Sequence, residues 1–140
     1  MQTNNQNSME YDCWLENQID CLENRDFARL DLTNLIEELK ALGRAEKSAV
    51  KSLAFQILIH LLLINYWHEE STYSKNHWQA EVNAFKYQLS DKLTTNYKLF
   101  LADNLDKIYA KARINAILKS NLNSDRFPEY CPFVLEDLFD

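Results

Sequence analysis

Two polar residues that lie among leucines and isoleucines, Glu46 and His60, are the side chains best placed for chemistry. A buried carboxylate with a raised pKa can transfer a proton, and a buried imidazole can act as a general base or bind a metal. The simpler interpretation, which we favour, is a neutral core histidine bonded to one partner and a glutamate paired with an arginine across a helical bundle. We expect Arg113 to be that arginine, because an unpaired buried carboxylate is strongly destabilising.

The histidines and cysteines lack the spacing of a metal site. No Glu-x-x-His, His-x-x-x-His, Cys-x-x-Cys or His-Glu-x-x-His pattern occurs. No serine or cysteine has a recognisable activating setting, and one glycine cannot build a phosphate-binding loop. The sequence therefore predicts no catalytic residues and no cofactor, and it favours a protein that is not an enzyme.

An aromatic pair, Tyr66 and Trp67, stands just before Glu69 and Glu70. Such a cluster could close a ligand pocket or form a protein-binding patch. The alternative is that the tryptophan covers the end of a helical bundle, and we favour that interpretation.

One apolar stripe with helical periodicity positions Glu46 and His60. With Leu32 as the origin and about 100° per residue, Leu42 falls just outside about 60° from it, and ten positions fall within that angle: Leu35, Ile36, Leu39, Gly43, Val50, Leu53, Ala54, Ile57, Leu61 and Ile64. Glu46 projects into this stripe and His60 onto its shoulder. They lie 14 residues apart, about 21 Å along a helix, so they cannot share a small site. The period continues through Gly43, which predicts one helix over residues 32–66 with Asp31 as its N-cap.

The remaining sequence predicts an all-α antiparallel bundle of about four main helices, with one long central helix and a short C-terminal helix. The first helix is expected over residues 12–24, and a polar loop over residues 68–74 should precede the third. That third helix carries Trp78, Val82, Phe85 and Leu89 at helical spacing. The fourth should run to about residue 119, and the last over residues 133–139. Residues 1–10 form a polar tail expected to be disordered, and residues 11–140 one helical domain.

Charge is unevenly distributed along the chain. The net charge is −6, which argues against general nucleic-acid binding. Residues 1–46 hold ten acidic and four basic residues, whereas residues 75–126 hold nine basic and five acidic ones. Antiparallel helices with complementary surfaces explain this split most simply. A self-complementary dimer or an acidic protein partner is the alternative.

The cysteine count and the polar N-terminus favour a reducing cytoplasm. Cys13 and Cys21 lie too far apart on a helix to form a disulfide with each other, and Cys131 makes the number odd. No signal peptide is expected in the first nine residues. The apolar run over residues 53–64 is too short to cross a bilayer, so no membrane partner is expected.

Several segments, taken in order, resemble the bacterial domain-of-unknown-function 29 family. The segment Trp14-Leu15-Glu16-Asn17-Gln18 looks like its first-helix signature. Asn34-Leu35-Ile36-Glu37-Glu38, ending in Leu42-Gly43, looks like its most recognisable segment, and Phe127-Pro128-Glu129 with Cys131-Pro132 looks like its C-terminal signature. The intervening matches are His60-Leu61-Leu62, Tyr66, Trp78, Tyr109 and Ala112-Arg113. This resemblance implies a compact helical fold and no established activity.

The leading function from sequence is a small cytoplasmic protein-interaction module, with homo-oligomerisation as one form. The evidence is the charge split, the surplus of aromatic residues and the lack of a catalytic pattern. The alternative is a binder of a small ligand or metal, or an enzyme, that uses His60 and an aromatic pocket at a helix end.

Overall fold

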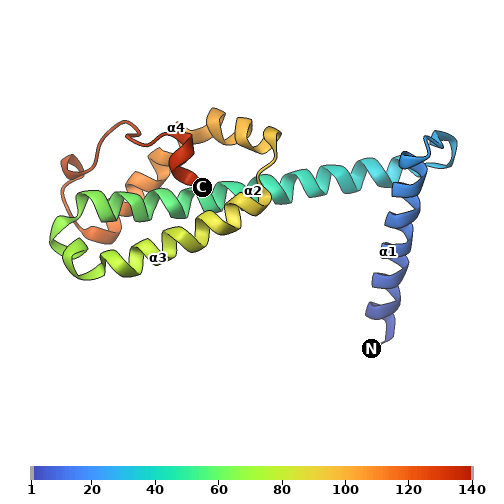
Figure 1. Ribbon diagram of the computed structural model, residues 1–140, viewed down its shortest axis with the longest axis horizontal. Coiled ribbons are helices and arrows are strands. Elements are labelled where there is room, and N and C mark those ends of the chain that lie inside the picture. The colour runs from blue at the N-terminus through green and yellow to red at the C-terminus, as the bar shows by residue number, and fades with distance from the viewer. Residues whose placement is uncertain (1, 140) are drawn as a thin grey trace. The chain divides into compact units, whose positions relative to one another are not determined.

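The computed structural model describes the backbone of residues 2–139 and the side chains of residues 10–139. Its α-helices are α1 (Gln2–Glu23), α2 (Leu32–Tyr66), α3 (His68–Lys92) and α4 (Thr95–Ser120). Three short 3-10 helices join or follow them: η1 (Phe27–Arg29), η2 (Ser124–Arg126) and η3 (Leu135–Leu138). Figure 1 shows these elements along the chain. The residues described contain no strand, so the predicted all-α class is confirmed.

Contacts divide the chain into two compact units, Met1–Arg44 (unit 1) and Ala45–Asp140 (unit 2). The two units are described separately below, and the division into a tail and one helical domain stays a prediction. The first helix begins at Gln2, well before the predicted start at residue 12. No glycine or proline lies between residues 2 and 23, so nothing in this polar segment interrupts a helix.

The long apolar period forms one helix, α2, as predicted. Its buried residues all lie between Val50 and Leu63. Over an 18-residue window its mean hydropathy reaches 1.5, and by length and composition alone such a helix could cross a membrane. Core helices of water-soluble proteins meet the same criterion, and 44% of this window is buried within the fold.

A single non-helical residue, Trp67, joins α2 to α3. The predicted polar loop at residues 68–74 is wrong, because α3 begins at His68. The amide of Trp67 donates to Leu63 O at 3.1 Å, and its carbonyl accepts from the Ser71 amide at 2.8 Å, so the backbone stays hydrogen-bonded through the turn. Glu69 and Glu70 lie in the first turn of α3, where the helix dipole favours carboxylates.

The helix α4 has defined caps at both ends. The Thr94 hydroxyl accepts from the Tyr97 amide at 3.2 Å, and Asn121 ends the helix in the left-handed conformation at φ 57°. The predicted C-terminal helix over residues 133–139 is shorter and tighter than expected, being the 3-10 helix η3.

The core of unit 2 lies between α2, α3 and α4 and is closed by the C-terminal segment. Three of the four residues predicted at helical spacing on α3 are buried: Trp78, Val82 and Leu89. On α4 the buried residues include Leu101, Ile108, Tyr109, Ala112 and Ala116. Phe127 and Leu138 extend this core from the loop and η3. In Figure 1 the C-terminal segment returns across the helices of this unit.

Candidate functional site

His60 is a buried residue with one clear hydrogen-bond partner. Its Nδ1 lies 2.7 Å from Gln56 O, and because a carbonyl only accepts, Nδ1 carries the proton. The ring also packs against Phe85, with centroids 5.6 Å apart. This is the environment expected of a histidine that belongs to the core.

Glu46 pairs with a lysine and not with the predicted arginine. Its Oε1 lies 3.6 Å from Lys92 Nζ, and both side chains are part-exposed. Arg113 is turned instead to the loop after α4, where its Nη2 donates to Ser124 O at 2.9 Å and its Nε to Phe127 O at 3.3 Å. The predicted Glu46–Arg113 pair is therefore wrong, since the loop carbonyls take up the guanidinium donors.

The aromatic pair at the end of α2 packs inside unit 2. Trp67 stacks on Trp78 with centroids 5.8 Å apart, and Tyr66 meets Phe127 edge-on at 6.4 Å. These contacts give both residues a packing role at the end of the helices. Glu46, His60, Tyr66, Trp67 and Arg113 thus have separate partners, and no shared site joins them. Within the described residues, no group of three or more His, Cys, Asp or Glu could hold a metal ion.

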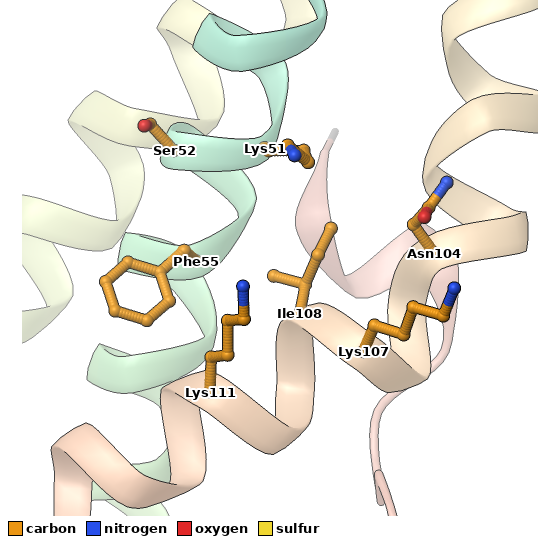
Figure 2. Close-up of a pocket in the computed structure, with 7 residues that line it drawn as sticks. All are labelled: Lys51, Ser52, Phe55, Asn104, Lys107, Ile108 and Lys111. Atoms are coloured by element: carbon orange, nitrogen blue, oxygen red, sulfur yellow. The ribbon is translucent and has the colours of Figure 1, made fainter.

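A groove between α2 and α4 was not predicted. Figure 2 shows Lys51, Ser52 and Phe55 on α2 facing Asn104, Lys107, Ile108 and Lys111 on α4. It encloses about 320 Å³. No ion pair of the described residues includes any of its three lysines. We call these seven residues the lysine groove.

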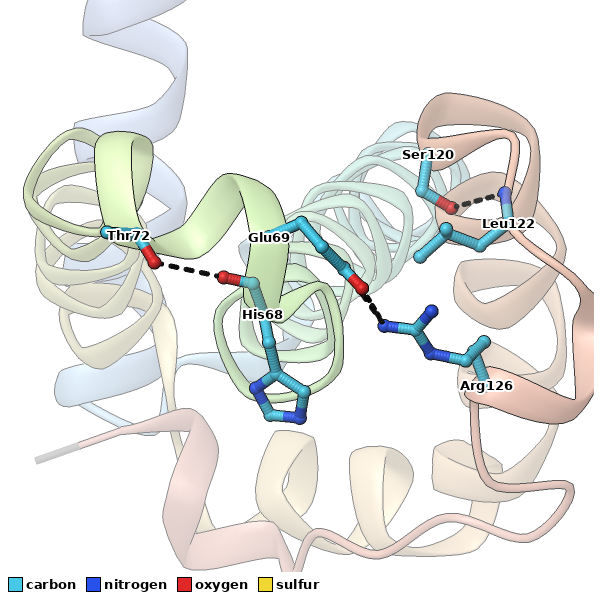
Figure 3. A network of polar contacts seen from close by, with 6 residues as sticks. All are labelled: His68, Glu69, Thr72, Ser120, Leu122 and Arg126. Carbon is cyan, nitrogen blue, oxygen red and sulfur yellow. Dashed lines mark hydrogen bonds and ion pairs between the residues drawn. The ribbon is translucent and has the colours of Figure 1, made fainter.

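A polar network holds the loop after α4 on the start of α3. Figure 3 shows the Arg126 guanidinium bonded to Glu69, with Nη2 2.9 and 3.0 Å from the two carboxylate oxygens. The Leu122 amide donates to the Ser120 hydroxyl at 3.2 Å. The amide of Glu69 itself and then Arg126 hold the pKa of the Glu69 carboxyl below its usual range. The two residues are 57 positions apart, so sequence spacing could not reveal the pair.

Unit 1 is held together mainly by polar contacts around Asp31. Its backbone amide donates to Gln18 Oε1 at 2.8 Å, and its carboxylate accepts from Asn34 Nδ2 at 2.7 Å and Trp14 Nε1 at 3.1 Å. These donors, Asn34 first, hold the pKa of the Asp31 carboxyl below its usual range. The position of Asp31 directly before α2 agrees with the predicted N-cap.

The apolar side chains of unit 1 are exposed or only half-buried. Of the residues 10–44, only Gln18 is buried. On α2, Leu32, Ile36, Leu39 and Leu42 are 56%, 49%, 59% and 57% exposed. Together with the half-buried Leu35 they form what we call the leucine stripe. The sequence predicted this apolar face but not its exposure.

The spacing of the leucine stripe is that of a coiled coil. Leu32, Leu35, Leu39 and Leu42 follow one another at intervals of three, four and three residues, the a and d positions of a heptad pattern. A helix with this pattern buries its stripe against another helix. In unit 1 the structure thus leaves an apolar stripe with this spacing largely exposed.

A sequence model of the family described as "Domain of unknown function DUF29" matches residues 8–140. The chain belongs to the DUF29 family. The match covers both units of this DUF29 protein, including the leucine stripe and the lysine groove. No curated protein and no solved structure matches the chain.

Proposed function

We propose that this DUF29 chain is a self-associating protein-interaction module. The observation that carries the proposal is the leucine stripe, four of whose five side chains are about half exposed. Apolar patches of this kind on a surface are typical of interaction sites. The stripe of a second copy is the occupant that we propose.

The charges beside the stripe favour an antiparallel pair of α2 helices. Asp31 directly precedes the first leucine of the stripe, whereas Arg44 lies two residues after the last one. An antiparallel arrangement brings the acidic end of one stripe beside the basic end of the other, and a parallel arrangement brings like charges together. Complementary charge at such flanking positions sets the orientation of paired helices.

The stripe alone supports only a weak dimer. Full burial of a half-exposed leucine or isoleucine contributes about 1 kcal/mol, so four such side chains on each of two copies contribute about 8 kcal/mol. The loss of translational and rotational freedom on association costs about 4–15 kcal/mol. We therefore expect association that depends on concentration in the accessible range.

A charge placed in the stripe tests the proposal. Leu39→Glu should raise the dimer dissociation constant by about tenfold or more, since a desolvated carboxylate at the interface costs well over 1.4 kcal/mol. The matched control is Leu118→Glu, because Leu118 is 75% exposed on α4, outside the stripe. A Leu39→Glu protein that self-associates as tightly as wild type would overturn the proposal.

The cytoplasm stays the proposed compartment. Cys13, Cys21 and Cys131 are all free in the structure, which supports a reducing environment.

A further inference from the structure

The lysine groove has the chemistry of a site for an acidic apolar segment. Phe55 and Ile108 form its apolar part, and Lys51, Lys107 and Lys111 surround them. Lys107 and Lys111 are four residues apart on one helix, an arrangement that is mutually repulsive. No ion pair of the described residues includes any of the three, and Asp103 lies one turn before Lys107 on the same helix. The groove thus places three amines beside apolar surface.

The helix α1 carries the complementary chemistry. It holds Glu10, Asp12, Glu16, Asp20 and Glu23 and no lysine or arginine. Three of its large apolar side chains, Tyr11, Ile19 and Leu22, are exposed.

The acidic and apolar residues of α1 lie side by side on its surface. With Tyr11 as origin, Leu22 projects at about 20° and Ile19 at about 80°. Asp12, Glu23 and Glu16 follow at about 100°, 120° and 140°. An apolar strip with carboxylates along one edge is what a groove with an apolar floor and a lysine rim can bind.

We infer that the lysine groove binds α1 of a second copy of this chain. The inference rests on the proposed self-association and adds to it a second contact, between the acidic helix of one copy and the basic groove of the other. The exposed strip of α1 covers Phe55 and Ile108, and the carboxylates at its edge reach the lysine ammonium groups. This contact supplies charge complementarity that the leucine stripe alone offers only in part.

Carbodiimide cross-linking of a mixture of unlabelled and isotope-labelled full-length chains tests this contact. The reagent joins a carboxylate and an amine only where they touch. We expect amide links between a carboxylate of α1 and a lysine of the groove, that is, from Asp12, Glu16 or Glu23 to Lys51, Lys107 or Lys111. Some of the linked peptide pairs should contain one labelled and one unlabelled peptide, which shows that the link joins two copies. The inference would be overturned if both peptides of every linked pair carried the same label, because the links would then lie within one chain. It would also be overturned if a sample that is dimeric by mass gave no such links. A sample that is monomeric by mass would overturn the proposed self-association as well.

Charge reversal provides the second test. Lys107→Glu with Lys111→Glu should remove these links and raise the dimer dissociation constant about tenfold, because several part-exposed ion pairs are lost. Lys75→Glu with Lys119→Glu changes the net charge equally at exposed positions outside the groove and should leave association unchanged.

A partner chain with Asp12, Glu16 and Glu23 changed to Lys should restore association with the groove variant. Equal effects of the two double variants would show that only net charge matters and would overturn the inference.

Discussion

Tyr109 donates its hydroxyl hydrogen to Pro128 O at 2.5 Å and so ties α4 to the loop that follows it. The tyrosine is 1% exposed, and removal of its hydroxyl would leave a carbonyl without this donor. Tyr109→Phe should therefore lower the free energy of unfolding by about 1–3 kcal/mol, measured by urea denaturation. Tyr130→Phe is the control, because Tyr130 is exposed. Equal stability of the Tyr109 variant and wild type would contradict this account of the loop.

Because of the same tyrosine, the free energy of unfolding should depend on pH in the alkaline range. Burial, with a smaller contribution from Cys131, raises the pKa of Tyr109 to about 12, from 10.0 in water. Between these values the folded protein keeps a proton that the unfolded chain releases, so stability from this group is complete below pH 10 and is lost as pH rises toward 12. The difference in unfolding free energy between wild type and Tyr109→Phe should shrink over this range. A difference that stays constant would mean that the folded tyrosine titrates like a free one.

The Glu46–Lys92 pair should contribute little to stability. Its side chains are 29% and 37% exposed, and ion pairs with this access to water are worth up to about 1 kcal/mol. Glu46→Gln should lower the free energy of unfolding by less than about 1 kcal/mol, and salt should reduce the difference. A double-mutant cycle with Lys92→Met isolates the pair. A loss of several kcal/mol that Lys92→Met does not share would indicate another role for Glu46.

Local patterns in the sequence predicted most of the helices. The 3.6-residue period identified α2 as one helix, because its apolar stripe continues over many turns. The start of α3 was missed, since residues 68–74 are polar and carry no period. At the turn there, Trp67 stacks on Trp78, eleven residues later, in a contact that no local pattern shows.

The candidate site was harder to predict, because partners depend on how helices are rotated and which segments lie beside them. The sequence showed that Glu46 needed a cation but not that Lys92 would face it. It favoured a core position for His60, and the structure places that residue in a buried position with Nδ1 2.7 Å from the carbonyl one turn earlier. The apolar face of residues 32–42 was evident, but periodicity cannot say what covers such a face.

The most direct test of the account is the mass of the unmodified full-length chain over a dilution series, measured by sedimentation equilibrium. The account predicts a species of twice the 16.5 kDa chain mass that forms as concentration rises and dissociates on dilution. Leu39→Glu should shift this transition to higher concentration, and Leu118→Glu should not. A single species of 16.5 kDa at every concentration would contradict self-association through the leucine stripe.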